Sequence, residues 1–185
     1  MTRLRFSTAG EVFESFPALR RLVATAPANE APLAFLARLA AGAEPKDAIG
    51  FCAFLLPRRE AVWWALQSVQ RMRPAGAPAG PALAAAEAWV RDPGDARRRE
   101  ALSVAETADP AEPATWVAWA AGYSGGSMLA SHAVPCPPDL TAKTARIAVL
   151  TALGRLPARE RDAALRNCIE ACFRLVDDEG GGART

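Results

Sequence analysis

Apolar segments of helical length follow one another along this chain from Ala9 to Val176, and proline or glycine separates nearly all of them. Within each segment apolar residues recur every three to four positions, the period of a helix that buries one face. No segment shows the alternation of apolar and polar residues that a half-buried strand requires. The sequence therefore predicts an all-α fold. We expect a compact array of about eight or nine short helices packed as αα-hairpins, with a solenoid-like stack as one option.

Prolines and glycines also place the expected helix boundaries. Residues 9–26 should form one or two short helices, with Pro17 opening the second, because proline fits the first turn of a helix. Pro57 should end one helix and start the next. The proline- and glycine-rich stretch 73–81 has the same composition on both flanks, so we interpret it as an internal loop. We expect one helical domain over residues 1–176.

A second turn signal divides the middle of the chain. The sequence Asp92-Pro93-Gly94-Asp95 predicts a turn in which Asp95 caps the helix that follows, and that helix should span residues 96–108. Its charged residues are expected to be solvated; they are Arg97, Arg98, Arg99 and Glu100. The polar, glycine-rich stretch 177–185 is predicted to be a disordered tail.

Three segments carry expectations about the core. The segment 45–56 is apolar on all sides, which is typical of a central, buried helix. For the helix expected over 139–153, the inward residues should be Leu140, Thr144, Ile147, Leu150 and Thr151. For the last helix, they should be Leu165, Cys168, Ile169, Cys172 and Val176.

Charge and hydropathy exclude several classes of protein. The 22 basic and 20 acidic residues give a net charge of only +2, which argues against nucleic-acid binding. No run of about 18 uncharged apolar residues is present, so no membrane span is expected. The charged N-terminal segment does not resemble a signal peptide. We therefore expect a cytoplasmic protein.

Residues Gly122 to Gly126 match the G-x-S-x-G string of hydrolases, in which Ser124 would be the nucleophile and His132 its base. That chemistry needs a sharp turn between a strand and a helix, and an acid between serine and histidine in chain order. Here a helical segment precedes Ser124, and Asp139 follows His132. A glycine-rich helix exit is the favoured interpretation; a backbone nest for an anion is an alternative.

Four residues could hold a metal ion, since His132 and Cys136, and again Cys168 and Cys172, are four residues apart. Imidazole and thiolate ligands suit tetrahedral zinc. The last two cysteines also belong to the apolar stripe of the final helix, and a buried free cysteine behaves as a small hydrophobe. We favour the second interpretation, so no metal and no cofactor is predicted.

Arginine and aromatic residues meet at two places. Arg58 and Arg59 precede Trp63 and Trp64, and Arg with exposed Trp is typical of protein interfaces. The alternative is that both tryptophans lie in the core. In the second place, an aromatic cluster could serve the core or a partner-binding groove; its members are Trp89, Trp116, Trp119 and Tyr123.

Three pieces of the chain carry a resemblance to a known family: LPRREAVWWA at 56–65, AWV at 88–90 and the segment 116–127 that ends in GYSGGS. They resemble the bacterial family catalogued as domain of unknown function 6931. The resemblance implies a small helical protein without an assigned activity, encoded near secretion-system or forkhead-associated-domain genes.

Together these observations favour a non-enzymatic adaptor, chaperone or assembly accessory that binds another protein, with a link to a secretion system. The expected partner-binding residues are Arg58, Arg59, Trp64, Tyr123, Ser124 and Ser127. One alternative is a metal-binding or hydrolytic protein that uses His132 with Ser124 or with Cys136, Cys168 and Cys172. A further alternative is a structural subunit of a homo-oligomer.

Overall fold

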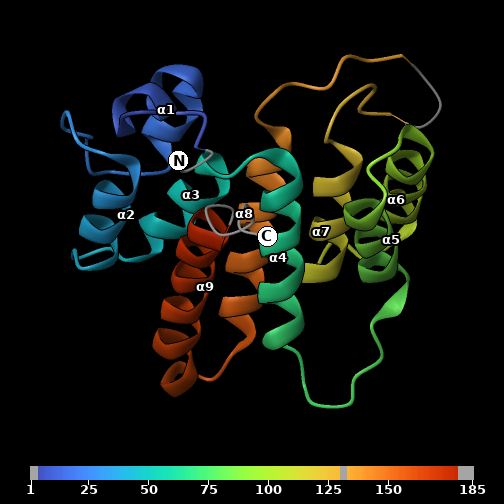
Figure 1. Cartoon of the computed structure of the whole chain (residues 1–185). Helices are drawn as coiled ribbons and strands as arrows, with labels where there is room; N and C mark the ends of the chain where they lie inside the picture. The colour runs from blue at the N-terminus through green and yellow to red at the C-terminus, as the bar shows by residue number, and fades with distance from the viewer. Residues whose placement is uncertain (1–3, 130–132, 179–185) are drawn as a thin grey trace, which may run out of the picture.

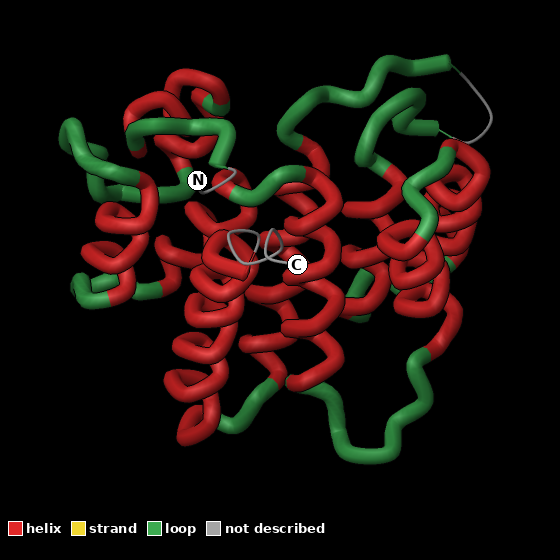
Figure 2. The backbone as a smooth tube through the Cα atoms, viewed as in Figure 1, coloured by secondary structure: helices red, strands yellow, loops and turns green. Residues whose placement is uncertain are grey.

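The computed structural model describes residues 4–129 and 133–178, and within these ranges the regular structure is entirely helical (Figure 2). The prediction of an all-α array of eight or nine helices is confirmed. The elements are α1 (Ala9–Ser15), the 3-10 helix η1 (Pro17–Arg21), α2 (Pro32–Ala40), α3 (Lys46–Leu55), α4 (Arg58–Arg71), α5 (Gly80–Arg91), α6 (Asp95–Thr107), α7 (Pro113–Gly122), α8 (Leu140–Arg155) and α9 (Ala158–Asp178).

Proline marks most of the helix starts, as the sequence predicts. Proline occupies one of the first two positions of η1, α2, α5 and α7, where its missing N–H has no helical partner to lose. Asp95 departs from the prediction. Gly94 is the N-cap of α6, and Asp95 is the first helical residue, where its carboxylate pairs with Arg98 and Arg99 instead of capping the helix.

Helices α4 and α8 lie at the centre of the molecule. Figure 1 shows α1–α3 on one side of this pair and α5–α7 on the other. One core cluster of buried side chains runs from Ala9 to Val176 and includes residues on both sides of the 73–79 loop. Because α3 packs against α8 and α9, helices far apart in sequence are neighbours, unlike the sequence-order contacts of a solenoid.

The residues predicted to be buried are confirmed for α3 and α9, whereas the prediction is wrong for one face of α8. Every residue of α3 from Ala48 to Leu55 is buried, and so are all five residues predicted to face inward on α9. On α8, however, Leu140, Ile147, Leu150 and Thr151 are only half-buried. The buried set on α8 consists of Thr141, Ala142, Thr144, Ala145, Ala148, Val149, Ala152 and Leu153.

Close packing explains this difference in α8. The helix contacts α3, α4, α7 and α9, and most of its buried residues are alanine or threonine, whose small side chains allow neighbouring helices to approach closely. Helix α9 also continues through Asp177 and Asp178, two residues that were expected to belong to the tail. The remainder of that expected tail, 179–185, lies outside the described residues.

Gly122 shows how closely these alanine-rich helices approach each other. A Cβ added at Gly122 would lie 3.0 Å from Leu102 Cα and 3.1 Å from Leu102 Cβ on α6. Such contacts are tighter than ordinary van der Waals packing, so α6 would have to shift by a few tenths of an ångström to admit a larger residue at the end of α7.

We expect Gly122→Ala to lower the free energy of unfolding by about 1–3 kcal/mol, because the added methyl group must push α6 and α7 apart. Gly154→Ala is the matched control, since Gly154 also lies near the end of a helix and a Cβ there meets no atom within 4 Å. The control should be neutral or stabilise by up to about 1 kcal/mol through helix propensity. Urea unfolding followed by circular dichroism measures both; equal effects would contradict the close-packing argument.

No helix in the described ranges combines the length and apolar character needed to cross a membrane.

Candidate functional site

The candidate site is built around the segment that connects α7 to α8, residues 123–139, called here the α7–α8 loop. Its described parts, 123–129 and 133–139, meet at an isolated antiparallel bridge between Ser127 and Pro135. Two backbone hydrogen bonds flank this bridge: Met128 N–H donates to the Val134 carbonyl at 2.8 Å, and Cys136 N–H donates to the Gly126 carbonyl at 3.0 Å. The two halves of the loop are thereby held side by side.

Arg98 fixes the start of this loop from α6. Its Nη1 donates to the carbonyl oxygens of Gly122 at 3.0 Å and Ser127 at 2.9 Å, and its Nε donates to Asp95 Oδ1 at 2.8 Å. The prediction that Arg98 is solvated is wrong, because the residue is only 6% exposed. A buried guanidinium needs several acceptors to replace its hydration, and the loop carbonyls with Asp95 provide them.

Other side chains bind the next carbonyls of the loop. Arg58, at the start of α4, donates from Nη1 to the Ser124 carbonyl at 3.0 Å. The Tyr123 carbonyl accepts from the Cys136 thiol at 3.1 Å and from the Thr141 hydroxyl at 2.9 Å. Groups from α4, α6, α8 and the loop itself therefore hold consecutive backbone carbonyls after α7 in fixed positions.

Gly126 is required at the point of closest approach to Arg98. Its φ of +59° lies in the left-handed region, and a Cβ there would lie 2.9 Å from Arg98 Nη2. Glycine satisfies both conditions because it has no Cβ. The GYSGGS motif thus encodes a backbone path that lets a buried arginine reach two carbonyls.

A hydrogen bond from a charged side chain and burial shift the pKa values of three groups around the loop. The hydrogen bond from Arg98 lowers the pKa of Asp95. Burial raises the pKa of the Cys136 thiol, with Arg58 and Arg98 opposing the rise, and burial also raises the pKa of Tyr123. Cys136 and Tyr123 consequently keep their protons at neutral pH, and Cys136 acts as a hydrogen-bond donor rather than as a thiolate nucleophile.

The outer surface of the loop is apolar. Among the described residues, the large hydrophobic side chains that are exposed are Leu129, at 40%, and Val134, at 37%. The backbone bond between Met128 and Val134 places these two side chains on adjoining halves of the same loop. At the base of the loop, the rings of Trp119 and Tyr123 stack with centroids 5.0 Å apart.

The residues predicted to bind a partner lie in different environments. Arg58 and the segment Tyr123 to Ser127 come together, although they lie far apart in sequence. Arg59 points elsewhere, since its Nε donates to the Val90 carbonyl at the end of α5 at 2.7 Å. The Ser127 hydroxyl accepts from the backbone N–H groups of Leu129 and Val134 and so supports the loop itself.

Trp64 does not lie at this surface, and its assignment as an interface residue is corrected. It is fully buried, and its indole N–H donates to the Cys168 carbonyl of α9 at 2.8 Å. Helix α4 is covered by α5, α7, α8 and α9, so few of its positions reach solvent. Trp63 is half-buried and packs against the same core.

The predicted aromatic cluster forms only in part. Trp119 stacks on Tyr123, whereas the Trp116 indole donates to the Pro110 carbonyl at 2.8 Å and Trp89 is buried in the main core.

The hydrolase alternative depended on His132, which lies outside the described residues. Ser124 follows a helix rather than a strand, and its carbonyl is bound by Arg58. A nucleophile elbow strains its serine. No residue other than glycine has a positive φ within the described ranges.

The cysteines that the metal-site alternative needs lie in different parts of the structure. Cys168 and Cys172 lie in the core beside Cys52, whereas Arg58, Arg98 and Asp139 are the charged groups around Cys136. Among residues 4–129 and 133–178, no group of three or more histidine, cysteine, aspartate or glutamate side chains is arranged to hold a metal ion.

Sequence reasoning missed Arg98, although a signal was present. Ala101, Leu102 and Ala105 form the buried stripe of α6, and the same helical period extended backwards by one turn reaches position 98. Leu129 and Val134 had no comparable signal, because single apolar residues in a loop are common.

The fold and the site define a class: an all-α protein with a loop whose backbone carbonyls are bound by side chains from α4, α6 and α8. A family model matches residues 35–176, and the chain belongs to that family, the family of unknown function DUF6931. No similar protein was found among the curated proteins or among the solved structures.

Proposed function

We propose that this chain is a non-enzymatic protein-binding module and that the α7–α8 loop, together with Arg58, forms its docking surface. The observation that supports this most directly is the exposure of Leu129 and Val134 on a loop whose backbone is held by Arg98 and Arg58. Backbone that is already held in place before binding, as it is in the described parts 123–129 and 133–139, loses little conformational entropy when a partner arrives. Apolar side chains on such a loop gain free energy when the partner covers them.

The positive charge next to the loop indicates which kind of side chain the partner should present. Arg5 and Arg58 both line a small hollow of about 50 Å³ with Phe16, Phe54 and Pro138, the last from the loop. Burial and the positive charge of Arg58 lower the pKa of Arg5, and the negative charge of Glu60 opposes this shift only in part, so the two guanidinium groups still repel each other. An acidic side chain on the partner would relieve this repulsion. The proposed partner therefore presents an acidic residue beside an apolar one.

The docking proposal is tested by the double substitution Leu129→Asp with Val134→Asp. The tagged chain is incubated with a lysate of the source organism, and captured proteins are identified by mass spectrometry. We expect one specific partner with the wild-type chain and at least about a tenfold loss with the double variant, because two buried interface charges each cost more than 1 kcal/mol. Both side chains are exposed, so folding should be unaffected.

Ala84→Asp is a surface control, since Ala84 is exposed on α5 and the substitution adds one negative charge where the double variant adds two. It should capture the partner as well as the wild-type chain does. Arg58→Glu should weaken capture, because the partner is expected to be acidic. Capture of the same proteins by wild type and double variant would refute the docking surface. Capture of the chain by itself would instead identify a homo-oligomer that uses this surface.

A further inference from the structure

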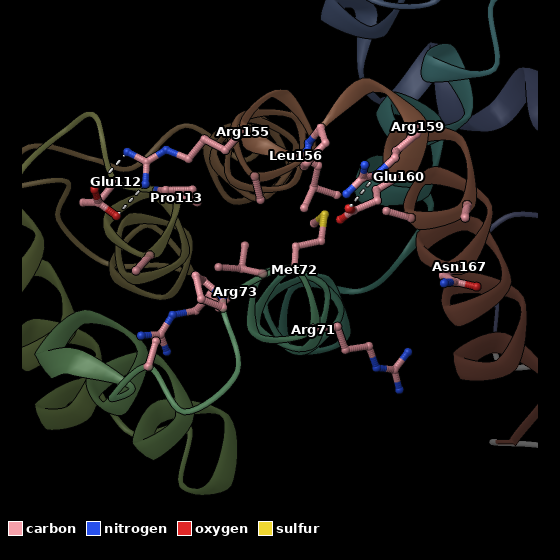
Figure 3. A pocket seen from close by; sticks show the side chains of 18 residues that line it. Arg71, Met72, Arg73, Glu112, Pro113, Arg155, Leu156, Arg159, Glu160 and Asn167 are labelled. Atoms are coloured by element: carbon pink, nitrogen blue, oxygen red, sulfur yellow. Dashed lines mark hydrogen bonds and ion pairs between the residues drawn. The ribbon is translucent and has the colours of Figure 1, made fainter.

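A cleft lies at the opposite end of α4 from the α7–α8 loop. It has a volume of about 830 Å³ and is formed where α4 and α8 end and α7 and α9 begin (Figure 3). This volume is in the range of sites that hold small molecules. None of the residues discussed for the docking surface lines it.

The inside of the cleft is mostly apolar. In Figure 3, Met72 points into the space between the four helix ends, toward Leu156. Val69 and Ala152 line the cleft from α4 and α8, and Pro113 lines it from α7. Such a lining favours an apolar molecular body over an ion or a sugar.

Most charges at the rim of the cleft are compensated. Arg155 forms a bidentate pair with Glu112, with nitrogen–oxygen distances of 2.8 and 2.9 Å, and Arg159 lies 3.5 Å from Glu160. Arg73 donates to the Pro78 carbonyl. Arg71, the last residue of α4, forms no ion pair within the described parts of the chain. Among the described lining residues, Arg71 and Arg73 thus have no acidic partner, and of these two only Arg71 also lines the smaller pocket beside the cleft.

A smaller pocket of about 70 Å³ adjoins the cleft and shares Arg71, Met72 and Asn167 with it. Ser68 and Cys168 complete its lining. Figure 3 shows Arg71 and Asn167 on the α4 and α9 sides of this part of the cleft. The pocket has the size of a carboxylate group or of two water molecules, each of which occupies roughly 30 Å³.

The Ser68 side chain indicates which chemical group the smaller pocket would bind. Ser68 is only 3% exposed, and its hydroxyl oxygen has no hydrogen-bond partner of normal geometry among the described residues, although it lies close enough to the Cys168 thiol to oppose the rise that burial causes in the pKa of that thiol. Leaving a buried hydroxyl unsatisfied costs about 1–3 kcal/mol, so such groups usually mark a bound molecule. Ser68, Arg71 and Asn167 together offer a hydroxyl, a positive charge and an amide to a group with two acceptor oxygens.

We propose that this cleft binds a small amphipathic carboxylic acid. The carboxylate occupies the smaller pocket, where it accepts hydrogen bonds from the Ser68 hydroxyl and the Asn167 amide and is neutralised by Arg71. The apolar body lies along Met72 and Leu156 in the larger cleft. This inference is independent of the docking surface, because the two sites share no residue.

Decanoate is the probe that tests this proposal, measured by isothermal titration calorimetry below its micelle concentration. We expect saturable binding with one molecule per chain. Decanol lacks the charge and acetate lacks the apolar body, so both should bind at least about tenfold more weakly. Ser68→Ala and Arg71→Gln should each weaken decanoate binding at least about tenfold, since each removes a carboxylate contact.

Arg91→Gln is the matched control, because Arg91 is likewise the last residue of its helix and lies outside both pockets. It should bind decanoate as the wild-type chain does. Ser68→Ala leaves a similar volume, and circular dichroism checks that each variant is folded. The proposal is overturned if decanoate shows no saturable binding, if decanol binds equally well, or if Arg71→Gln and Arg91→Gln bind alike.

Discussion

Trp64→Ala should lower the free energy of unfolding by about 3–5 kcal/mol, which is the usual cost of truncating a large buried aromatic side chain. Trp64 is fully buried at the centre of α4, and its indole N–H donates to the Cys168 carbonyl. The substitution leaves a cavity and also removes this link between α4 and α9. Urea unfolding followed by far-ultraviolet circular dichroism measures the loss.

Trp63→Ala is the control for Trp64→Ala, because the neighbouring tryptophan is only half-buried. Its expected cost is smaller, about 1–2 kcal/mol, in proportion to the apolar area that it buries. If Trp64→Ala proved as stable as the wild type and lost only partner capture, the original assignment of Trp64 to an interface would be right and its place in the core would be wrong.

Arg98→Met should lower the free energy of unfolding by about 2–4 kcal/mol. Methionine preserves much of the apolar stem but leaves the Gly122 and Ser127 carbonyls without their donor, and each unsatisfied buried group costs about 1–3 kcal/mol. Because these carbonyls hold the α7–α8 loop, limited proteolysis should cut that loop faster in the variant than in the wild type.

Arg97→Met provides the comparison on the same helix. Arg97 is exposed and pairs with Glu100 on the surface, so its replacement should cost less than about 1 kcal/mol. A second readout is the Asp95 carboxyl, whose pKa should rise toward its ordinary value in Arg98→Met and stay lowered in Arg97→Met. Equal stability of the two variants would show that the bonds from Arg98 do not hold the loop.

The sequence predicted the helices well because their boundaries are local. Proline determines where α2 and α7 begin whatever surrounds them, and an unbroken apolar segment such as α3 has no polar face to expose. The inward face of α8 was harder to predict, since four neighbouring helices decide which of its residues are buried.

The candidate site was only partly predictable because its contacts join distant parts of the chain. Arg58 and Ser124 were both singled out, but the bond between them spans 66 residues of sequence. Trp64 and Cys168 are 104 residues apart, so no local pattern showed that the tryptophan faces inward. Arg98 sits in a run of three arginines, which resembles a solvated face unless the helical period is followed.

The four free cysteines can report on motions of this protein without any added label, because they differ in exposure. Cys52, Cys168 and Cys172 are buried in the core, whereas Cys136 is half-exposed in the α7–α8 loop. A thiol reagent added to the unmodified chain should therefore react in two phases. The first phase follows local opening around Cys136, and the second follows global unfolding. The two rates therefore separate the motion of the α7–α8 loop from the stability of the helices that carry it.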